Sequence, residues 1–581
     1  MGANHMGRSM GERLAIDPNW PDIMYFASRQ NGLMKSTDGG KHWAQVNHFP
    51  SKGEQDIGLS FVCFDSSSGS AKKASATLYV GVTATGKESN LYCSKDSGWS
   101  WQELENGPSG LIPHKMIMDR EGVVYIACND GPGPYGITKG EIWKFNMSTG
   151  SWKNVSPKGA GGGFGGITIS NSDQQIILVC TIDWWKPDEI YRSADGGNPW
   201  EGIGRSAQKD RNGADYLCWR RPGCTNLSWG GWMGDIDIDP FNPDRAFYVT
   251  GQGIWISDNI NDEPEKIVWK FENTGLEETV ALDLTPSING ALFSAVGDLG
   301  GFRHPEDELD QPVAGGMFDN PIFGNTDGID FAALNTNIVV RCGTNYSTHQ
   351  NGAFSTDNGV TWSPFPVQPE KDEHHSGGKI AVSADGSSIV WRINKQFYYS
   401  PDMGNTWTKC KNLKGPNRIT ADKVNPEKFY AYSESKLYMS DDGGASFSVV
   451  ARNIKGSGWR DRVNTVFGKE GDIWLVAGEH LYRSVSSGSD PVRINPVEKI
   501  YTIGFGKAFA TDGYPTLFIV GVIDGVYGVF RSFDEGENWV RINDDQHQYG
   551  SMDYIAGDEN IFGRVYIGTH GRGIVYGDPV K

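Results

Sequence analysis

No run of 18 apolar residues occurs in this chain of 581 residues, which excludes an ordinary membrane-spanning helix. Residues 1–19 contain no apolar core of the kind that marks a secretory signal, so we expect no signal peptide within them. No cysteine pair has the CxxC spacing, and no cysteine–histidine pattern resembles a zinc site. We therefore predict neither a bound metal nor a cofactor.

The chain has only eight cysteines. Two of them, Cys218 and Cys224, flank a short polar loop. The sequence leaves open whether these two form a disulfide or remain free thiols.

Basic residues are fewer than acidic ones: the chain has 53 Lys and Arg and 71 Asp and Glu, which gives a formal net charge of −18. Such a charge repels phosphate backbones, so we expect no nucleic-acid partner. An acidic chain with 20 tryptophans suits instead a neutral, hydroxyl-rich ligand such as a polysaccharide.

The length is too great for one ordinary core, which favours two domains or more. Glycine is abundant, at 76 residues, and Trp, Tyr and Phe together make 12% of the chain. This composition is typical of many short strands joined by tight turns, so we predict an all-β protein.

One pattern recurs along the chain, with the consensus Ser-x-Asp-x-Gly-x-(Thr/Ser)-Trp. Each copy follows a short apolar strand, and neighbouring copies mostly stand about one four-stranded propeller blade apart. The good copies begin at Ser36, Ser94, Ser193, Ser355, Ser400, Ser440 and Ser532, and degenerate copies lie at 143–152, 255–258 and 482–488.

The chemistry of this Asp-box predicts a hairpin turn. Its Asp carboxylate accepts hydrogen bonds from N–H groups of the turn, its Gly permits a positive φ, and its aromatic residue packs back onto the sheet. The carboxylates also suggest calcium binding or catalysis. We favour the structural interpretation, because the boxes fall at outer hairpins whereas propeller ligands bind near the central channel.

A boundary between domains is expected near Gly275. The stretch that contains it, residues 270–298, carries no box and restarts a blade. We predict an N-terminal propeller over residues 1–275 with about five blades, and a C-terminal propeller over residues 276–581 with about seven.

Several stretches outside the boxes are distinctive. In this order they resemble glycoside hydrolase family 74, the xyloglucanases and xyloglucan-oligosaccharide reducing-end cellobiohydrolases. They are Met10–Asn19, Gly110–Lys115, Asn129–Gly136, Asp183–Ser193, Gly231–Asn242, Leu292–His304, Arg541–Gly550 and Gly571–Asp578.

The resemblance implies two seven-bladed propellers that face each other across a cleft. It implies an inverting hydrolase that cleaves the β-1,4-glucan backbone of xyloglucan with two aspartates, one from each propeller. One aspartate protonates the leaving oxygen and the other activates water, which inversion requires to fit between carboxyls roughly 6.5–9.5 Å apart.

The general acid implied by the resemblance is Asp298, in the stretch SAVGDLGGF. The residues themselves agree, since Asp298 follows the apolar run ALFSAV and enters a glycine-rich loop. A carboxylate at such a rim, with apolar neighbours that raise its pKa, suits a general acid. The alternative is an Asp that only caps the turn.

The partner base has no match in the chain. In the family it lies in a stretch like ARTDIGGAYRW, upstream of the stretch that matches Met10–Asn19. Asp56-Ile57-Gly58 lies in a different blade context, so the role is not transferred to Asp56. We therefore expect an N-terminally truncated chain that lacks about two blades of roughly 40 residues each and hydrolyses poorly by itself.

Substrate-binding candidates follow from the stacking of sugars on aromatic rings. The tandem Trp184 and Trp185 resemble the family's platform on the leaving-group side of the cleft. Trp232 and Trp219 are further candidates, and the alternative for each Trp is packing in a core or a box. His114 and His304 are candidates for cleft contact, against a purely structural role.

Four glycosylation sequons, at Asn146, Asn154, Asn226 and Asn345, favour a secreted protein together with the predicted fold. We expect a monomer whose partner is xyloglucan or a related β-glucan, with no membrane association.

Three other functions are compatible with a propeller that carries Asp-boxes. A sialidase needs an arginine triad and a Tyr/Glu pair, and no upstream Arg-x-Pro signature is visible. A non-enzymatic propeller, such as a sorting-receptor ectodomain or an assembly factor, binds peptides or proteins. Its receptor forms need a transmembrane segment, and the sequence shows none. A catalytically impaired homologue that only binds β-glucan remains the main alternative.

Overall fold

The computed structural model describes residues 10–579 except 85–89, 184–187, 215–232, 252, 274–275, 277–278, 289, 312–315, 346–347, 371–376, 414, 416–417 and 459. Strands are its regular structure, with two short 3-10 helices, η2 (Ser66–Ser68) and η4 (Pro264–Lys266). This confirms the all-β prediction. No helix in the described part of the chain is long and apolar enough to span a bilayer. The chain divides into two compact units between residues 275 and 276.

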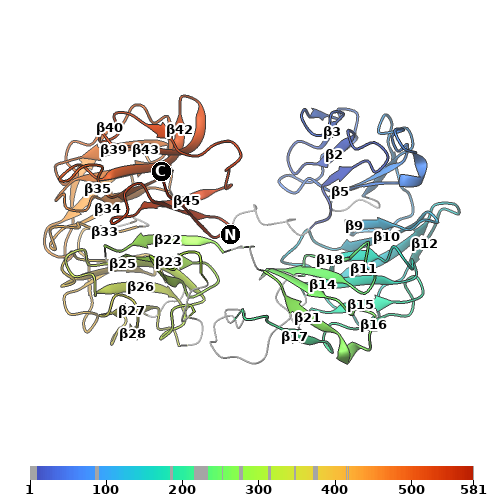
Figure 1. The fold of residues 1–581 in the computed structure, drawn as a ribbon, viewed down its shortest axis with the longest axis horizontal. Coiled ribbons are helices and arrows are strands. Elements are labelled where there is room, and N and C mark those ends of the chain that lie inside the picture. The colour runs from blue at the N-terminus through green and yellow to red at the C-terminus, as the bar shows by residue number, and fades with distance from the viewer. Residues whose placement is uncertain are drawn as a thin grey trace. The chain divides into compact units, whose positions relative to one another are not determined.

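The first unit, coloured blue to green in Figure 1, contains five sheets. Their strands in chain order are β1 (Leu14–Ile16), β2 (Met24–Ala27), β3 (Leu33–Ser36), β4 (Ala44–Gln45); β5 (Leu59–Phe64), β6 (Leu78–Val82), β7 (Leu91–Ser94), β8 (Gln102–Glu103); β9 (Ile112–Met118), β10 (Val123–Asn129), β11 (Gly140–Asn146), β12 (Ser151–Asn154); β13 (Gly163–Ile169), β14 (Ile177–Ile182), β15 (Ile190–Ser193), β16 (Glu201–Gly202); and β17 (Gln208–Asp210), β18 (Asp235–Ile238), β19 (Ala246–Thr250), β20 (Gly253–Ser257), β21 (Val268–Phe271).

The second unit, coloured green to red, contains seven sheets. Their strands are β22 (Ala281–Pro286), β23 (Ala291–Val296), β24 (Phe302–Pro305); β25 (Asn325–Phe331), β26 (Val339–Thr344), β27 (Gly352–Ser355), β28 (Ser363–Pro364); β29 (Lys379–Val382), β30 (Ile389–Ile393), β31 (Gln396–Ser400), β32 (Thr408–Lys409); β33 (Thr420–Ala421), β34 (Phe429–Ser433), β35 (Lys436–Ser440), β36 (Ser448–Arg452); β37 (Arg462–Thr465), β38 (Ile473–Ala477), β39 (His480–Ser484), β40 (Val492–Arg493); β41 (Lys499–Gly506), β42 (Thr516–Ile523), β43 (Val526–Ser532), β44 (Val540–Arg541); and β45 (Met552–Gly557), β46 (Val565–Thr569), β47 (Ile574–Gly577).

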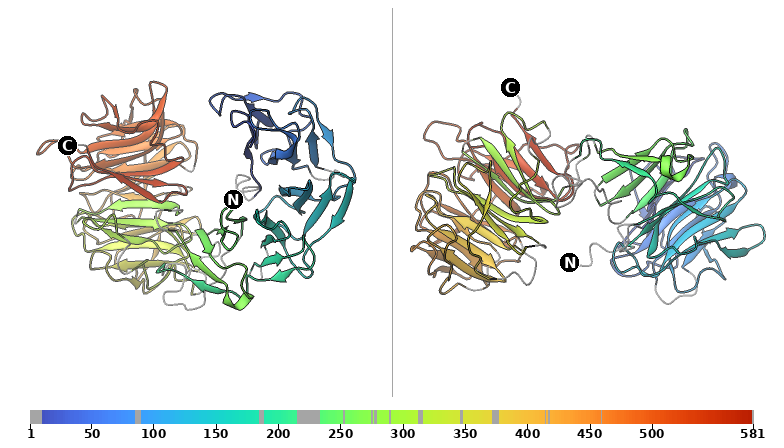
Figure 2. Two further views of the ribbon diagram at one scale, coloured as in Figure 1. Left: turned by 45° about the vertical axis from the view of Figure 1, so that its right-hand side comes forward. Right: turned by 90° about the horizontal axis from the view of Figure 1, so that it is seen from below.

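Each sheet is an antiparallel meander, apart from β17, which pairs parallel with β21. The first strands of successive sheets lie against one another, as β22 does against β25 and β25 against β29. In the second unit the ring closes, because β45 of the last sheet contacts β22 of the first. This is the arrangement of propeller blades, and Figure 2 shows it from two further directions.

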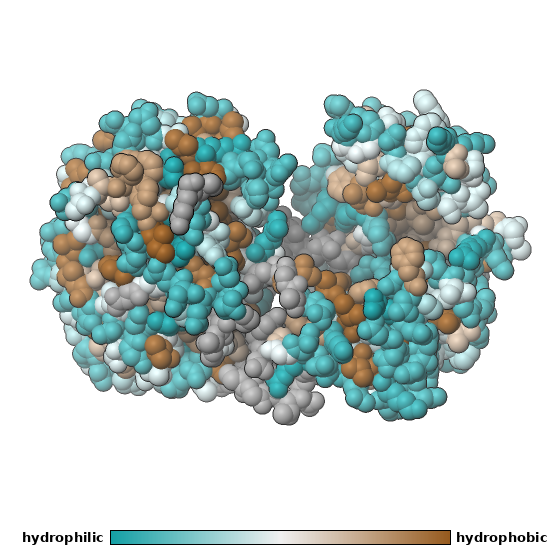
Figure 3. All heavy atoms as spheres, viewed as in Figure 1, coloured by the Kyte–Doolittle hydropathy of each residue, from teal (hydrophilic) through white to brown (hydrophobic). Residues whose placement is uncertain are grey.

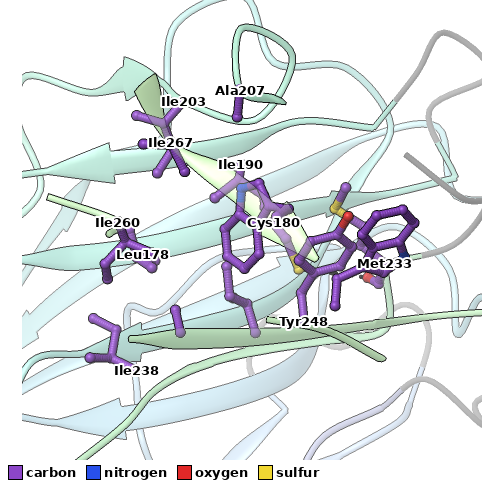
Figure 4. Packing of buried hydrophobic residues seen from close by; sticks show 14 of the residues in the cluster. Leu178, Cys180, Ile190, Ile203, Ala207, Met233, Ile238, Tyr248, Ile260 and Ile267 are labelled. Atoms are coloured by element: carbon purple, nitrogen blue, oxygen red, sulfur yellow. Dashed lines mark hydrogen bonds between the residues drawn. The ribbon is translucent and has the colours of Figure 1, made fainter. Parts of the chain in front are cut away.

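Apolar side chains fill the space between neighbouring blades. Between the fourth and fifth sheets, Leu178 and Cys180 pack against Ile238 and Tyr248, and all four are buried (Figure 4). Comparable clusters lie between other neighbouring sheets of both units. The burial of both faces explains the near-continuous apolar runs in the second strands, such as β14 and β42.

The predicted Asp-box hairpins are present between the third and fourth strands of their blades. In all seven, the Ser hydroxyl donates to the Asp carboxylate at 2.7–2.9 Å and accepts from the Gly N–H at 2.8–3.0 Å. Backbone N–H groups of the turn also donate to the carboxylate, as Thr406 does to Asp402 at 2.8 Å. These bonds lower the pKa of Asp402, so the box stabilises the fold above the ordinary carboxyl pKa and loses that contribution as the pH falls below it.

Lys115 links the sheets at the two ends of the first unit. It lies on β9 with its side chain only 2% exposed, and its Nζ is 2.9 Å from Oε1 of Glu12, which precedes β1. The same Nζ bonds Asp235 and lies 4.0 Å from Asp237, both on β18. One buried ammonium therefore holds carboxylates from the first and last blades.

The box geometry predicts that Ser400→Ala destabilises the protein. Ser400 is fully buried, and its removal leaves the Gly404 N–H without its acceptor and takes one of the donors from Asp402. We expect a loss of about 1–3 kcal/mol in the free energy of unfolding, measured by denaturant titration. The exposed Ser363→Ala is the control and should change it by less than about 0.5 kcal/mol; equal effects would contradict the role of the box.

The buried ammonium predicts a larger effect for Lys115→Met. Removing it leaves carboxylates facing one another, which typically costs about 3–5 kcal/mol. Urea unfolding of the first unit should show this loss, and the added change Asp235→Asn should recover part of it. Lys139→Met is the control, because Lys139 also pairs with a carboxylate, Glu141, but its side chain is 63% exposed. A cost for Lys115→Met no larger than the control would contradict the linkage.

Candidate active site

Asp298 lies in the loop between β23 and β24, the second and third strands of the first blade of the second unit. The register pairs Val296 at the end of β23 with Ala281 at the start of β22. Consequently the loop returns beside the start of the innermost strand, and the Gly297 N–H donates to the Val280 carbonyl at 2.9 Å. The sequence thus places a carboxylate beside the centre of this blade ring.

Asp298 is exposed, and its backbone is left-handed with φ +64°. Its N–H donates to Oδ1 of Asn325, the first residue of β25, at 2.5 Å. Asn325 therefore anchors the loop to the neighbouring blade. The loop is thus held through its backbone, and the Asp298 side chain lies at the protein surface.

Gly301 ends the loop, and the backbone at this position requires a glycine. It has φ +83°, and a Cβ at this position would stand 2.5 Å from the Ser294 carbonyl. Any other residue would push the loop away from β23, so the glycine fixes where Asp298 stands.

Basic residues at the same ends of the inner strands were not identified from the sequence. Arg462 begins β37, and Arg418 precedes β33 by two residues. Nη2 of Arg418 donates to the Tyr554 hydroxyl at 2.8 Å, and both guanidinium groups lie within 5.4 Å of the Tyr554 ring centre. Arg418, Arg462 and Tyr554 come from three different blades, so no local sequence pattern predicts that they meet.

Burial alone would raise the pKa of Tyr554, but Lys379, Arg418 and Arg462 outweigh it and lower that pKa below the ordinary value. Next to it, Asp553 pairs with Arg460 at 3.2 Å and with Nδ1 of His570 at 3.4 Å. The inner strands of the second unit thus begin in a charged, hydrogen-bonded ring on the face that carries Asp298.

His304 lies on β24, in the hairpin that carries Asp298. It is half-buried, and its Nε2 is 2.8 Å from the Ser294 hydroxyl. Burial lowers its pKa to about 4, so the ring is neutral at pH 7. The register pairs it with Leu292, further from the loop than the Ser294–Phe302 pair, so its contact with a ligand remains a prediction.

His114 is fully buried on β9 of the first unit. Its Nε2 lies 2.8 Å from the Gly131 carbonyl, and burial lowers its pKa to about 4. This environment supports the structural alternative, in which the neutral ring holds the loop between β10 and β11.

The tryptophans singled out for sugar stacking, Trp184, Trp185, Trp219 and Trp232, lie outside the described residues, as do Cys218 and Cys224. Their predicted roles are therefore carried forward as predictions. Of the flanking residues, Asp183 directly follows β14 and is buried.

Three other carboxylates lie on the corresponding face of the first unit. Asp183 accepts from the Ile137 N–H at 2.9 Å, and burial raises its pKa. Asp130 accepts from the Thr138 N–H at 2.9 Å; burial would raise its pKa, but the bonds from Thr138 and neighbouring N–H groups lower it. Asp56 has φ +65°, and its carbonyl accepts from Arg29. Asp130 and Asp183 both brace the loop between β10 and β11.

One group of three carboxylates in the described part of the chain converges closely enough to hold a cation, namely Glu12, Asp235 and Asp237. Lys115 already occupies their centre. The ammonium supplies the positive charge that these oxygens would otherwise require from a metal.

Comparison with known proteins agrees with this architecture. A xyloglucanase of Paenibacillus is 40% identical over the whole of this chain, which spans 60% of that protein's length. Xyloglucanase Xgh74A of Acetivibrio thermocellus is 39% identical, and the chain covers 72% of its length. The crystal structure of the GH74 xyloglucanase from Xanthomonas campestris matches with a TM-score of 0.82 at 33% identity, over all of this chain and 84% of that one. A search of protein-family profiles finds no match.

The blade count and the identity along the whole chain lead to the same assignment. The blade sheets of the two units, seven of them with an Asp-box, and relatives up to 40% identical along the whole chain identify it as a member of glycoside hydrolase family 74.

Proposed function

We propose that this protein hydrolyses the β-1,4-glucan backbone of xyloglucan with Asp298 as general acid. The observation that carries the proposal is the exposed Asp298, held by Gly301 and Asn325 on the face where the inner strands begin. The similar proteins of Paenibacillus and Acetivibrio thermocellus are xyloglucanases, which supports the same substrate here.

In this mechanism the Asp298 carboxyl donates its proton to the glycosidic oxygen as the bond breaks. A bound sugar chain that excludes water from a carboxyl disfavours the charged form, so substrate binding favours the protonated acid. A second aspartate acts as general base on water, and the product is inverted.

A binding-only protein is the second candidate. It is favoured by residues 1–581, in which no stretch matches the family's base aspartate. Such a protein would bind xyloglucan and release no reducing ends.

Removal of the acid is the most direct test of the proposal. Asp298→Asn keeps the size of the side chain and removes its proton, so we expect release of reducing sugar from xyloglucan to fall about 10²–10⁴-fold. Asp441→Asn is the control, because Asp441 is an exposed aspartate in the Asp-box turn between β35 and β36 and should leave the rate unchanged.

Undiminished activity of Asp298→Asn would remove Asp298 from the mechanism. A wild-type chain that binds xyloglucan without hydrolysing it would establish the binding-only alternative. If the wild type is fully active, Asp56, Asp130 and Asp183 are the first carboxylates to test as base.

The stacking platform gives a second prediction. Replacing Trp184 and Trp185 together by Ala should weaken binding to xyloglucan by about 1–3 kcal/mol for each lost aromatic contact. Affinity electrophoresis in gels with xyloglucan, unbranched cellulose derivative or mannan measures this, and the wild type should be retarded most by xyloglucan. Equal retardation of the double variant and the wild type would count against the platform.

A further inference from the structure

Three phenylalanines of the second unit form an exposed cluster, which we call the Phe platform: Phe509, Phe533 and Phe562. Their ring centres are 5.4–5.6 Å apart in all three pairs. Phe509 is 72% exposed and Phe533 40% exposed, although the surface seen in Figure 3 is largely hydrophilic. Exposure of three large rings to water is unfavourable. A ligand that covers the rings would gain the free energy of burying their apolar surface.

The Phe platform lies on the opposite face of the blades from Asp298. Phe509 lies between β41 and β42, and Phe562 between β45 and β46, which are first-to-second strand connections. Phe533 belongs to an Asp-box between β43 and β44. In a meander these turns face away from the second-to-third connection that carries Asp298, so the platform is separate from the proposed active site.

A cavity of about 490 Å³ adjoins the platform, because the loop with Phe562 also contributes Ile561 and Arg564 to its wall. Arg303, Glu306 and Asp307 from the end of β24 contribute to the same wall. The volume falls within the range of about 300–1,000 Å³ typical of small-ligand sites.

Three polar atoms near the Phe platform are buried without a hydrogen-bond partner among the described residues. Nη1 of Arg564 is one, although its Nε and Nη2 bind Asp578 at 2.6 and 2.9 Å. Oε1 of Glu559 is another, and burial raises the pKa of Glu559 to about 8. Nε of Arg531, whose guanidinium stands 4.5 Å from the centre of the Phe533 ring, is a third. Of these three residues, Arg564 also lines the cavity.

We propose that the Phe platform and the adjoining cavity form a second, non-catalytic binding site for an uncharged glycan chain. The rings take the apolar face of a sugar, and the cavity takes its hydroxyl groups. The proposal rests on the proposed function for the identity of the chain, which is the glucan substrate itself.

The charges around the site favour a neutral, hydroxyl-rich ligand. The cavity presents donors from Arg303 and Arg564 beside acceptors from Glu306 and Asp307, and hydroxyl groups both donate and accept. A second copy of this chain, with its net charge of −18, or an acidic polymer would be repelled. A site of this kind would hold polymeric substrate to the protein while Asp298 acts elsewhere.

The test uses the full chain with the platform changed by Phe509→Ala and Phe562→Ala, and a cavity variant, Glu306→Ala. Phe241→Ala is the matched control, because Phe241 is 97% exposed in the first unit. Retardation in xyloglucan gels should fall at least about fivefold for the platform variant and also fall for the cavity variant, but not for the control. Hydrolysis of short xyloglucan oligosaccharides should be unchanged, while kcat/KM on the polymer falls.

Unchanged retardation and polymer hydrolysis of the platform variant, with an active wild type, would overturn the second site and leave the proposed function standing. A wild type that is neither retarded by nor active on any glucan would overturn both proposals. A wild type that self-associates in sedimentation, with a monomeric platform variant, would show that the rings serve a copy of the chain and would also overturn the site.

Discussion

A four-stranded antiparallel meander sends its second-to-third connection to one face and its third-to-fourth connection to the other, and the position of each functional group here depends on that alternation. The Asp-boxes lie in third-to-fourth connections and stay on one face. Asp298 lies in a second-to-third connection and so reaches the other face, beside the starts of β22 and β25. The carboxylates of the boxes and of the proposed active site are thereby kept apart by topology.

The local features of this fold could be predicted from the sequence, because their signals are local. A box occupies eight consecutive residues, and the strand that ends at Val296 is a single apolar run. The same reasoning could not find the ring around Tyr554, since Lys379, Arg418 and Arg462 meet only when three blades close around a centre. Nor could it find the Phe platform, whose rings come from loops of two blades.

Burial was the other property that the sequence concealed. His114 was a candidate for ligand contact because it stands in a family-like stretch, yet it is fully buried and neutral. Lys115, one residue further along the same strand, holds three carboxylates from two distant blades and was not singled out. Both residues lie on β9, an inner strand, where successive side chains point to opposite faces of the sheet.

The central claim is that Asp298 acts as the acid of an inverting glycosidase. Inversion converts a β-linkage into a product whose new reducing end is first formed in the α-configuration. Proton NMR of the anomeric region during the first minutes of xyloglucan hydrolysis measures this before mutarotation equalises the anomers. The account predicts that the α-anomer appears first in the wild type and that Asp298→Asn slows its appearance; a β-anomer formed first would contradict the proposed mechanism.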